Sequence, residues 1–194
     1  MPVAQETPGA ATFPVVRRAA IGERFVGAYI MHKQRPILKD GKEVINKTTG
    51  KPRHEMIVHA LVMPGNTITV GNSENFTTPE AGDVVRLILK GKAFGQWIDG
   101  LKAMQGVQRA GDIIEMTVDQ AQAYDADGNV KGPVISTQAE ADKVPRGVTL
   151  GFYGPLTLRA CTPAEMDWVT KADEAYATIA AGRTADAGDF GEPF

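Results

Sequence analysis

The chain has 194 residues, a formal net charge of −2, 43% apolar residues and a single cysteine. These values are typical of a soluble globular protein with one domain of roughly 150 residues and short appendages. They exclude an internal disulfide, and because no apolar run approaches the ~20 residues of a membrane helix, we expect no membrane partner. The lone Cys161 fits a reducing cytoplasm.

The small net charge conceals a strong asymmetry along the chain. Residues 1–111 carry fifteen Lys and Arg against nine Asp and Glu, a net charge of +6, whereas residues 112–194 carry six against fourteen, a net charge of −8. A basic front and an acidic rear suggest that the front binds a polyanion, which repels the rear. The alternative is that the charges only solvate the surface.

The first expected strand follows a short lead, residues 1–12, that reads as disordered. Arg24–His32 alternates, with Val26, Ala28 and Ile30 on one side and Phe25, Tyr29 and then Lys33 on the other. Phe25 and Tyr29 are candidates for stacking on nucleic-acid bases. The alternative is that both rings complete the core.

A long basic segment comes next, from Lys33 to Arg53. Asp40-Gly41 and Thr49-Gly50 are turn signals within it, so we expect an extended hairpin or finger. Because its positive charges repel one another, a bound polyanion would relieve the repulsion and release counterions. The cations are Lys33, Arg35, Lys39, Lys42, Lys47, Lys51 and Arg53, against the two acids Asp40 and Glu43.

Further strands are expected in the middle of the chain. His54–Met63 and Thr67–Val70 are rich in β-formers, and a loop over Asn72–Gly82 contains Phe76. Asp83–Lys92 alternates clearly enough to predict two faces. Its core face holds Val85, Leu87 and Leu89, and its basic face holds Arg86, Lys90 and Lys92 with Val84 and Ile88.

Helical spacing then replaces the period of two. Over Ala93–Gln105, an apolar stripe at i, i+3, i+4 and i+7 consists of Phe94, Trp97, Ile98 and Leu101. Two strands follow, Asp112–Val118 and Val148–Arg159, the latter interrupted at Gly154-Pro155. Between them we expect a hairpin turn at Asp127-Gly128 and a polar stretch to Arg146.

This element order predicts a mainly β fold, an OB-fold-like five-stranded barrel with one internal helix and a C-terminal helix. Another small barrel or sandwich would give a similar pattern. Residues 13–160 form the expected barrel domain. A capping box at Thr162-Pro163-Ala164-Glu165 then begins the helix assigned to residues 161–181, an acidic stalk, and a flexible acidic tail covers residues 182–194.

Catalytic motifs are not found. His32, His54, His59 and Cys161 lack the spacing of a zinc site, and no Gly-rich loop ends in Lys-Ser or Lys-Thr. We therefore expect no enzymatic activity and no cofactor or metal. Asp112, Glu115 and Asp119 leave a metal-dependent nuclease as a rival, although a solvated strand face explains them better.

A cationic groove combined with aromatic faces is what holds single strands without regard to sequence. The basic segment supplies a binding arm, Arg86, Lys90 and Lys92 supply a strand face, and Phe25 and Tyr29 supply stacking rings; Phe76, Phe152 and Tyr153 are weaker candidates. No helix resembles a reader of base edges, so unpaired strands suit the pattern better than duplex.

The last six residues, Asp189-Phe190-Gly191-Glu192-Pro193-Phe194, resemble the C-terminal tip of bacterial and phage single-stranded DNA-binding proteins. The resemblance implies an OB-fold that coats exposed single strands during replication, recombination and repair, in the host cytoplasm if the gene is a phage gene. It also implies that Asp189, Phe190, Glu192, Pro193 and Phe194 recruit replication and repair proteins.

The chain departs from that family in several respects. The tip has fewer acids, the tether is short and follows a helix, and the strands lack the stacking tryptophans of bacterial relatives. We therefore do not extend the tetramer of the bacterial relatives to this chain, and a homo-oligomer is kept as an alternative to a single copy. A second alternative is a replication or recombination mediator that binds other proteins, or duplex or RNA through the basic arm.

Overall fold

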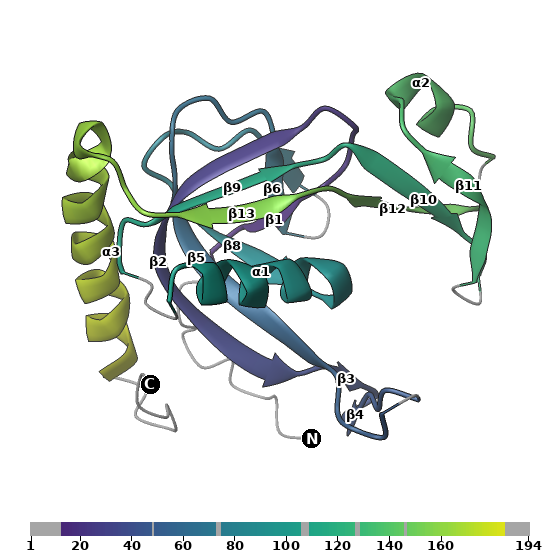
Figure 1. The fold of residues 1–194 in the computed structure, drawn as a ribbon, viewed down its shortest axis with the longest axis horizontal. Coiled ribbons are helices and arrows are strands. Elements are labelled where there is room, and N and C mark those ends of the chain that lie inside the picture. The colour runs from purple at the N-terminus through teal and green to yellow at the C-terminus, as the bar shows by residue number, and fades with distance from the viewer. Residues whose placement is uncertain are drawn as a thin grey trace, which may run out of the picture.

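A computed structural model describes residues 13–47, 49–72, 75–105, 109–126, 129–145 and 147–184. Most of the described chain is built on one eight-stranded sheet with the spatial order β13-β9-β2-β5-β8-β1-β6-β7 (Figure 1). The mainly β fold is thus confirmed. The strands are β1 (Val15–Arg17), β2 (Arg24–Pro36), β5 (His54–Val62), β6 (Thr69–Asn72), β7 (Asn75–Thr77), β8 (Val84–Leu89), β9 (Ile113–Thr117) and β13 (Leu156–Arg159).

The expected closed five-stranded barrel is wrong. β13 pairs only with β9, and β8 pairs with β5 on one side and with β1 on the other, so β13 and β8 share no ladder. The short β1 also contributes a strand that sequence alternation did not reveal, because its three residues are too few to show a period. The sheet is therefore open.

Helix α1 (Gly91–Ala103) packs on one face of this sheet, as the apolar stripe predicts. We call this the inner face and the opposite side the outer face. Trp97 is fully buried there, and Phe94, Ile98 and Leu101 pack around it. Gly100 allows α1 to approach β13, since a Cβ at this position would stand 3.0 Å from Leu158 Cδ1. The helix thus covers the gap between β8 and β13.

A β-bulge in β2 determines which way its basic side chains point. The pairing of β2 with β5 shifts by one residue between Tyr29 and Met31. A shift of one residue moves the following side chains to the other face. Lys33 and Arg35 therefore lie on the outer face, opposite the core face of Tyr29, and not beside Tyr29 as expected.

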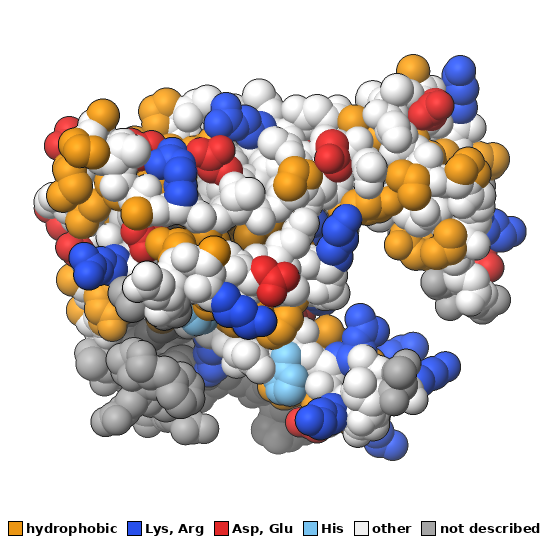
Figure 2. Space-filling view, in the orientation of Figure 1, with side chains coloured by type: hydrophobic (Ala, Val, Ile, Leu, Met, Phe, Trp, Pro, Cys, Tyr) orange, Lys and Arg blue, Asp and Glu red, His pale blue; other side chains and the backbone are white. Residues whose placement is uncertain are grey.

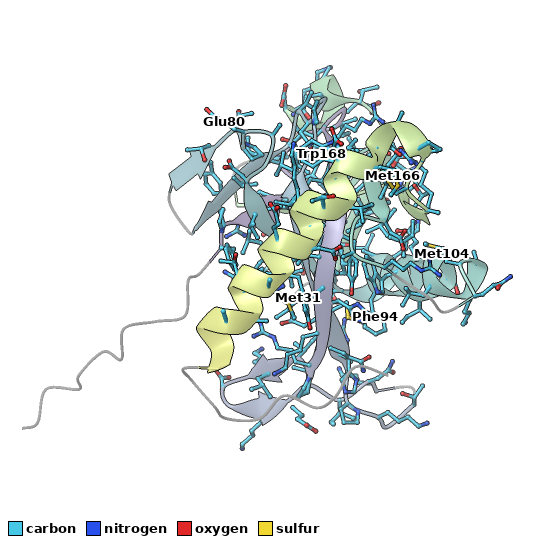
Figure 3. All side chains as sticks on the ribbon, turned by 90° about the vertical axis from the view of Figure 1, so that its left-hand side faces the viewer. Met31, Glu80, Phe94, Met104, Met166 and Trp168 are labelled. Carbon is cyan, nitrogen blue, oxygen red and sulfur yellow. The ribbon has the colours of Figure 1, made fainter. Side chains whose placement is uncertain are left out.

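Helix α3 (Met166–Thr184) covers one end of that outer face and is not a free stalk. A short 3₁₀ turn (Pro163–Glu165) with the predicted capping box precedes it. Its fully buried Ala172 packs with Val26 and Ala28 of β2, and Trp168 and Ile179 flank the same cluster. Figure 3 shows α3 lying across the sheet, with Met31 next to its lower half.

An ion-pair network fixes the start of α3 to the sheet. The Arg159 guanidinium donates from Nη1 and Nη2 to the two Glu165 oxygens, each at 2.8 Å, and also to Glu115 at 3.2 Å. The Thr162 amide adds a hydrogen bond to Glu165 at 3.0 Å. The hydrogen bonds from Arg159, followed by those from Thr162, lower the pKa of Glu165 to about 2.

This network makes the fold sensitive to acid. Because the pKa of Glu165 is lowered from its ordinary value of 4.5 to about 2, its carboxylate stabilises the fold above pH 4.5, and this contribution is lost as the pH falls toward 2. We expect Glu165→Gln to lower the free energy of unfolding by about 1 kcal/mol or less at neutral pH. Between pH 4.5 and 2, the free energy of unfolding of the variant should then fall by less than that of the parent.

Urea unfolding at neutral pH and in the acid window measures both effects. Glu174→Gln, on the exposed side of α3, is the matched control. If both variants show the pH dependence of the parent, Glu165 does not anchor the helix.

Two projections extend from the main sheet in the same direction (Figure 1). One is the hairpin of β3 (Leu38–Lys39) and β4 (Lys42–Glu43), which confirms the predicted finger. The other is a separate sheet of β10 (Gln120–Tyr124), β11 (Val130–Ile135) and β12 (Thr149–Tyr153), which we call the arm, with the one-turn helix α2 (Gln138–Ala141). Of the arm, the sequence predicted only the strand that contains β12; it assigned no element to β10 and a polar stretch to the segment of β11 and α2. The turn predicted at Asp127-Gly128 lies outside the described residues.

Candidate functional site

The outer face of the main sheet carries a basic cluster, defined here as Arg35, Arg86 and Lys90 around Glu55. Arg35 Nε lies 2.6 Å and Lys90 Nζ 2.9 Å from the Glu55 carboxylate, whose side chain is only 5% exposed. Arg86 Nε donates to the Phe13 carbonyl at 2.8 Å. Two cations, one from β2 and one at the start of α1, therefore hold one buried carboxylate. Arg86 on β8 adds a third cation, close enough to Arg35 for the two charges to interact.

Electrostatics in this cluster favour an additional anion. Burial alone would raise the pKa of Glu55, but the hydrogen bonds and charges of Lys90 and Arg35 outweigh burial and lower it. Burial and then the charge of Arg35 lower the pKa of Arg86, so these two guanidinium groups repel each other. One carboxylate does not neutralise three cations, and a phosphate beside them would relieve the remaining repulsion.

The hairpin adds a second group of cations. Asp40 and Gly41 both have positive φ angles, 53° and 74°, as the type I′ form of a two-residue hairpin turn requires. This turn places Lys39 and Lys42 directly opposite each other, and both are exposed. Like charges in facing positions destabilise a hairpin, so here too a bound anion would remove a cost.

Lys90 and Lys92 connect the base of the hairpin with the base of the arm. Lys90 contacts Glu55 at the start of β5, where the hairpin segment ends, and Lys92 Nζ lies 5.4 Å from the ring centroid of Tyr153, where β12 ends. Figure 2 shows an open notch between the hairpin and the arm. Lys and Arg side chains lie on the hairpin side of this notch and at its inner end. We call this notch the cationic cleft.

The basic residues predicted from sequence do not form one row. They lie in the basic cluster, along the hairpin segment, on β2 and in the first turn of α1. Arg86 lies in β8, Lys90 is the N-cap residue of α1, and Lys92 lies in the first turn of α1, so the expected strand face does not hold all three. Lys33 and Arg35 lie on β2. The others, Lys39, Lys42, Lys47, Lys51 and Arg53, are exposed along the hairpin segment.

Phe25 and Tyr29 do not offer rings for stacking, contrary to the expectation. Phe25 is 0% and Tyr29 8% exposed, and both belong to the core beneath α1. The Tyr29 hydroxyl is 2.8 Å from His32 Nδ1, and burial is the main cause of its raised pKa. Their alternative assignment to the core is the correct one.

Sequence reasoning missed the buried Glu55 and, in the arm, Tyr124. Gln120–Tyr124 alternates polar and apolar residues, a strand signal that was available but was not used. The terminal residues Asp189, Phe190, Glu192, Pro193 and Phe194 lie outside the described residues. Their assignment to partner binding stays a prediction.

Two of the three acids of the rival nuclease hypothesis, Glu115 and Asp112, form other contacts in the structure. Glu115 accepts from Arg159 and lies 3.5 Å from Arg24, and Asp112 accepts from the Arg109 amide at 2.7 Å. Within the ranges that the structure describes, no three or more His, Cys, Asp and Glu residues are grouped to hold a metal ion. None of the helices in these ranges has the length and apolarity needed to cross a membrane.

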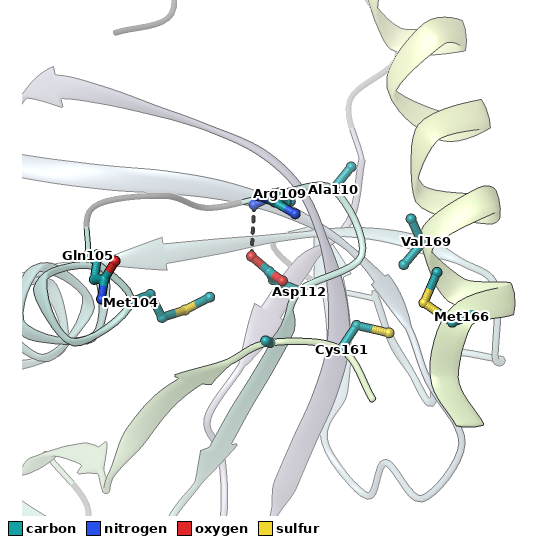
Figure 4. A pocket seen from close by; sticks show the side chains of 9 residues that line it. Met104, Gln105, Arg109, Ala110, Asp112, Cys161, Met166 and Val169 are labelled. Atoms are coloured by element: carbon teal, nitrogen blue, oxygen red, sulfur yellow. Dashed lines mark hydrogen bonds between the residues drawn. The ribbon is translucent and has the colours of Figure 1, made fainter. Parts of the chain in front are cut away.

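A cavity of about 490 Å³ lies on another side of the molecule, between the end of α1 and the start of α3 (Figure 4). Its lining includes Met104, Cys161, Met166 and Val169, with Arg109 as its basic residue. The cavity has no basic cluster, so the outer face and the cationic cleft are the stronger candidate site. Compared with protein-family models, curated proteins and solved structures, the chain matches none.

Proposed function

We propose that the protein binds single-stranded DNA with little sequence preference, through the basic cluster and the cationic cleft, and so protects exposed strands during replication, recombination and repair. The observation that carries this proposal is the grouping of Arg35, Arg86 and Lys90 on neighbouring elements, beside a cleft edged by further lysines. Such an arrangement follows a phosphate backbone and does not select a particular base.

The shape of the cleft supports single strands over duplex. One of its walls is a narrow two-stranded hairpin and the other is the small arm sheet, and no described helix presents base-reading side chains. A flexible single strand can bend to follow cations that lie on different elements. A rigid duplex would need them along one line.

The order of the central strands supports a partly open OB-type fold. Taken in chain order as first to fifth, β2, β5, β8, β9 and β13 follow the spatial order fifth-fourth-first-second-third, and α1 comes between the third and the fourth. OB-folds bind nucleic acid on the face of strands two and three and through the loops that join strands one to two and four to five. The corresponding parts here are the basic cluster, the hairpin and the arm.

Titration of a labelled oligo-dT and a labelled duplex of equal length, each at two salt concentrations, tests the proposal. We expect tighter binding of the single strand, a mild pyrimidine preference at most, and weaker binding as the salt rises. Equal affinity for duplex would contradict the proposal and favour the alternative of a mediator that uses its basic arm on other ligands. Recruitment of replication and repair proteins by the terminal residues is a separate part of the proposal.

A further inference from the structure

We propose that Tyr124 and Tyr153 form an aromatic platform on the arm that stacks unpaired bases on the wall of the cationic cleft. This inference rests on the proposed function and adds a site for the bases to a site for phosphates. It replaces the stacking role that the sequence suggested for Phe25 and Tyr29, which are buried.

Strand register places the two tyrosines on one face of the arm. Gln120 pairs with Tyr153, Gln122 with Gly151, and Tyr124 with Thr149. Directly paired residues point to the same side of a sheet, as do residues two apart in a strand. The two rings therefore share a face with Gly151 between them.

Gly151 leaves room for the Tyr124 ring. A Cβ on Gly151 would stand 2.9 Å from Cε2 of that ring, closer than a side chain tolerates. The ring thus lies over the glycine and leans toward Tyr153. Both rings are half-buried, so each is held in place while part of it stays accessible.

Lys92 identifies which side of the arm this face is turned to. Its ammonium group lies 5.4 Å from the Tyr153 ring centroid. Lys92 belongs to the first turn of α1, two residues after the Lys90 that contacts Glu55 at the base of the hairpin. A base on the platform would therefore have its phosphate near Lys92. This charge complementarity selects an unpaired base of a nucleic acid as the occupant, since an apolar peptide would gain nothing from the cation.

Binding of a 15-nucleotide oligo-dT and of an abasic strand of equal length, followed by fluorescence anisotropy, separates bases from phosphates. We expect the parent protein to bind oligo-dT about tenfold more tightly. The double variant Tyr124→Leu/Tyr153→Leu should lose this preference and keep its affinity for the abasic strand. The double variant with Phe at both positions should retain the preference, because Phe keeps the π face.

Tyr176→Ala, which removes an exposed ring on α3, is the control and should change neither affinity. If the parent binds both strands equally, or if the Leu variant keeps the preference, the platform is wrong while the proposed function stands. If neither strand binds, the proposed function itself fails.

A measurement on the unchanged protein covers the case in which the Leu variant does not fold. An oligonucleotide with 5-iodouracil, photo-crosslinked and analysed by mass spectrometry, should form adducts at Tyr124 or Tyr153. Adducts confined to other residues would overturn the platform.

Discussion

Replacing Lys39 and Lys42 with Gln should weaken binding of oligo-dT and flatten its salt dependence. Each lost phosphate contact reduces the slope of log K against log salt by about 0.7 for a single strand, so the double variant should lose roughly 1.4. If both proteins converge near 1 M salt, the affinity at 0.1 M falls by about 25-fold. Relief of the repulsion across the turn should leave the hairpin at least as stable.

A charge-matched control separates a local from a general effect. Lys102 lies in the last turn of α1 and Lys171 on α3, so Lys102→Gln/Lys171→Gln removes the same charge away from the cleft. Salt-dependent titration of both double variants provides the comparison. Equal slopes for the two would mean that the net charge, and not the hairpin, governs binding.

Gly154→Ala should be among the most destabilising single substitutions in the chain. Gly154 is buried where the arm joins the main sheet, and an added Cβ would overlap the Thr117 carbonyl and stand 3.0 Å from the Asp119 nitrogen. These atoms belong to the backbone and cannot rotate away. We expect the free energy of unfolding to fall by roughly 3 kcal/mol, as in overpacked cores.

Gly95→Ala provides the opposite result from the same chemical change. Gly95 lies within α1 with no atom within 4 Å of the added Cβ. The substitution should therefore raise the free energy of unfolding by about 0.5–1 kcal/mol through helix propensity. Urea unfolding midpoints at constant slope measure both variants. A Gly154→Ala protein as stable as the parent would show that the junction can yield.

Local signals carried much of the fold. The turn at Asp40-Gly41, the apolar stripe of α1 around Trp97, and the capping box at Thr162 each occupy a few consecutive residues. Backbone preferences and periodicity act at this range, so a sequence can be read for them directly. The strand interruption at Gly154-Pro155, which separates β12 from β13, is another local signal of this kind.

Long-range packing decided what the sequence could not reveal. Phe25 and Tyr29 alternate with other apolar residues, which predicts one covered and one open face, but α1 and α3 cover β2 on opposite sides. The single-residue bulge after Tyr29 then reverses the expected face of Lys33. The docking of a helix distant in sequence and the extra residue of a bulge produce no local pattern in the sequence, so neither could be predicted from it.

For the candidate site, composition predicted the cations but not their grouping. The excess of Lys and Arg in the front half is visible in the sequence. The contacts of Arg35 and Lys90 with Glu55, and the position of Arg86 near Arg35, depend on the pairing of β2, β5 and β8. Tyr124 escaped attention because the arm is a local sheet within a stretch rich in polar residues.

The notch between hairpin and arm is open along its outer side (Figure 2). A strand lodged there could enter sideways, without threading a free 5′ or 3′ end through a ring. Covalently closed circles would then be ligands as good as linear molecules, and many copies of the protein could load at once along the interior of a long gap.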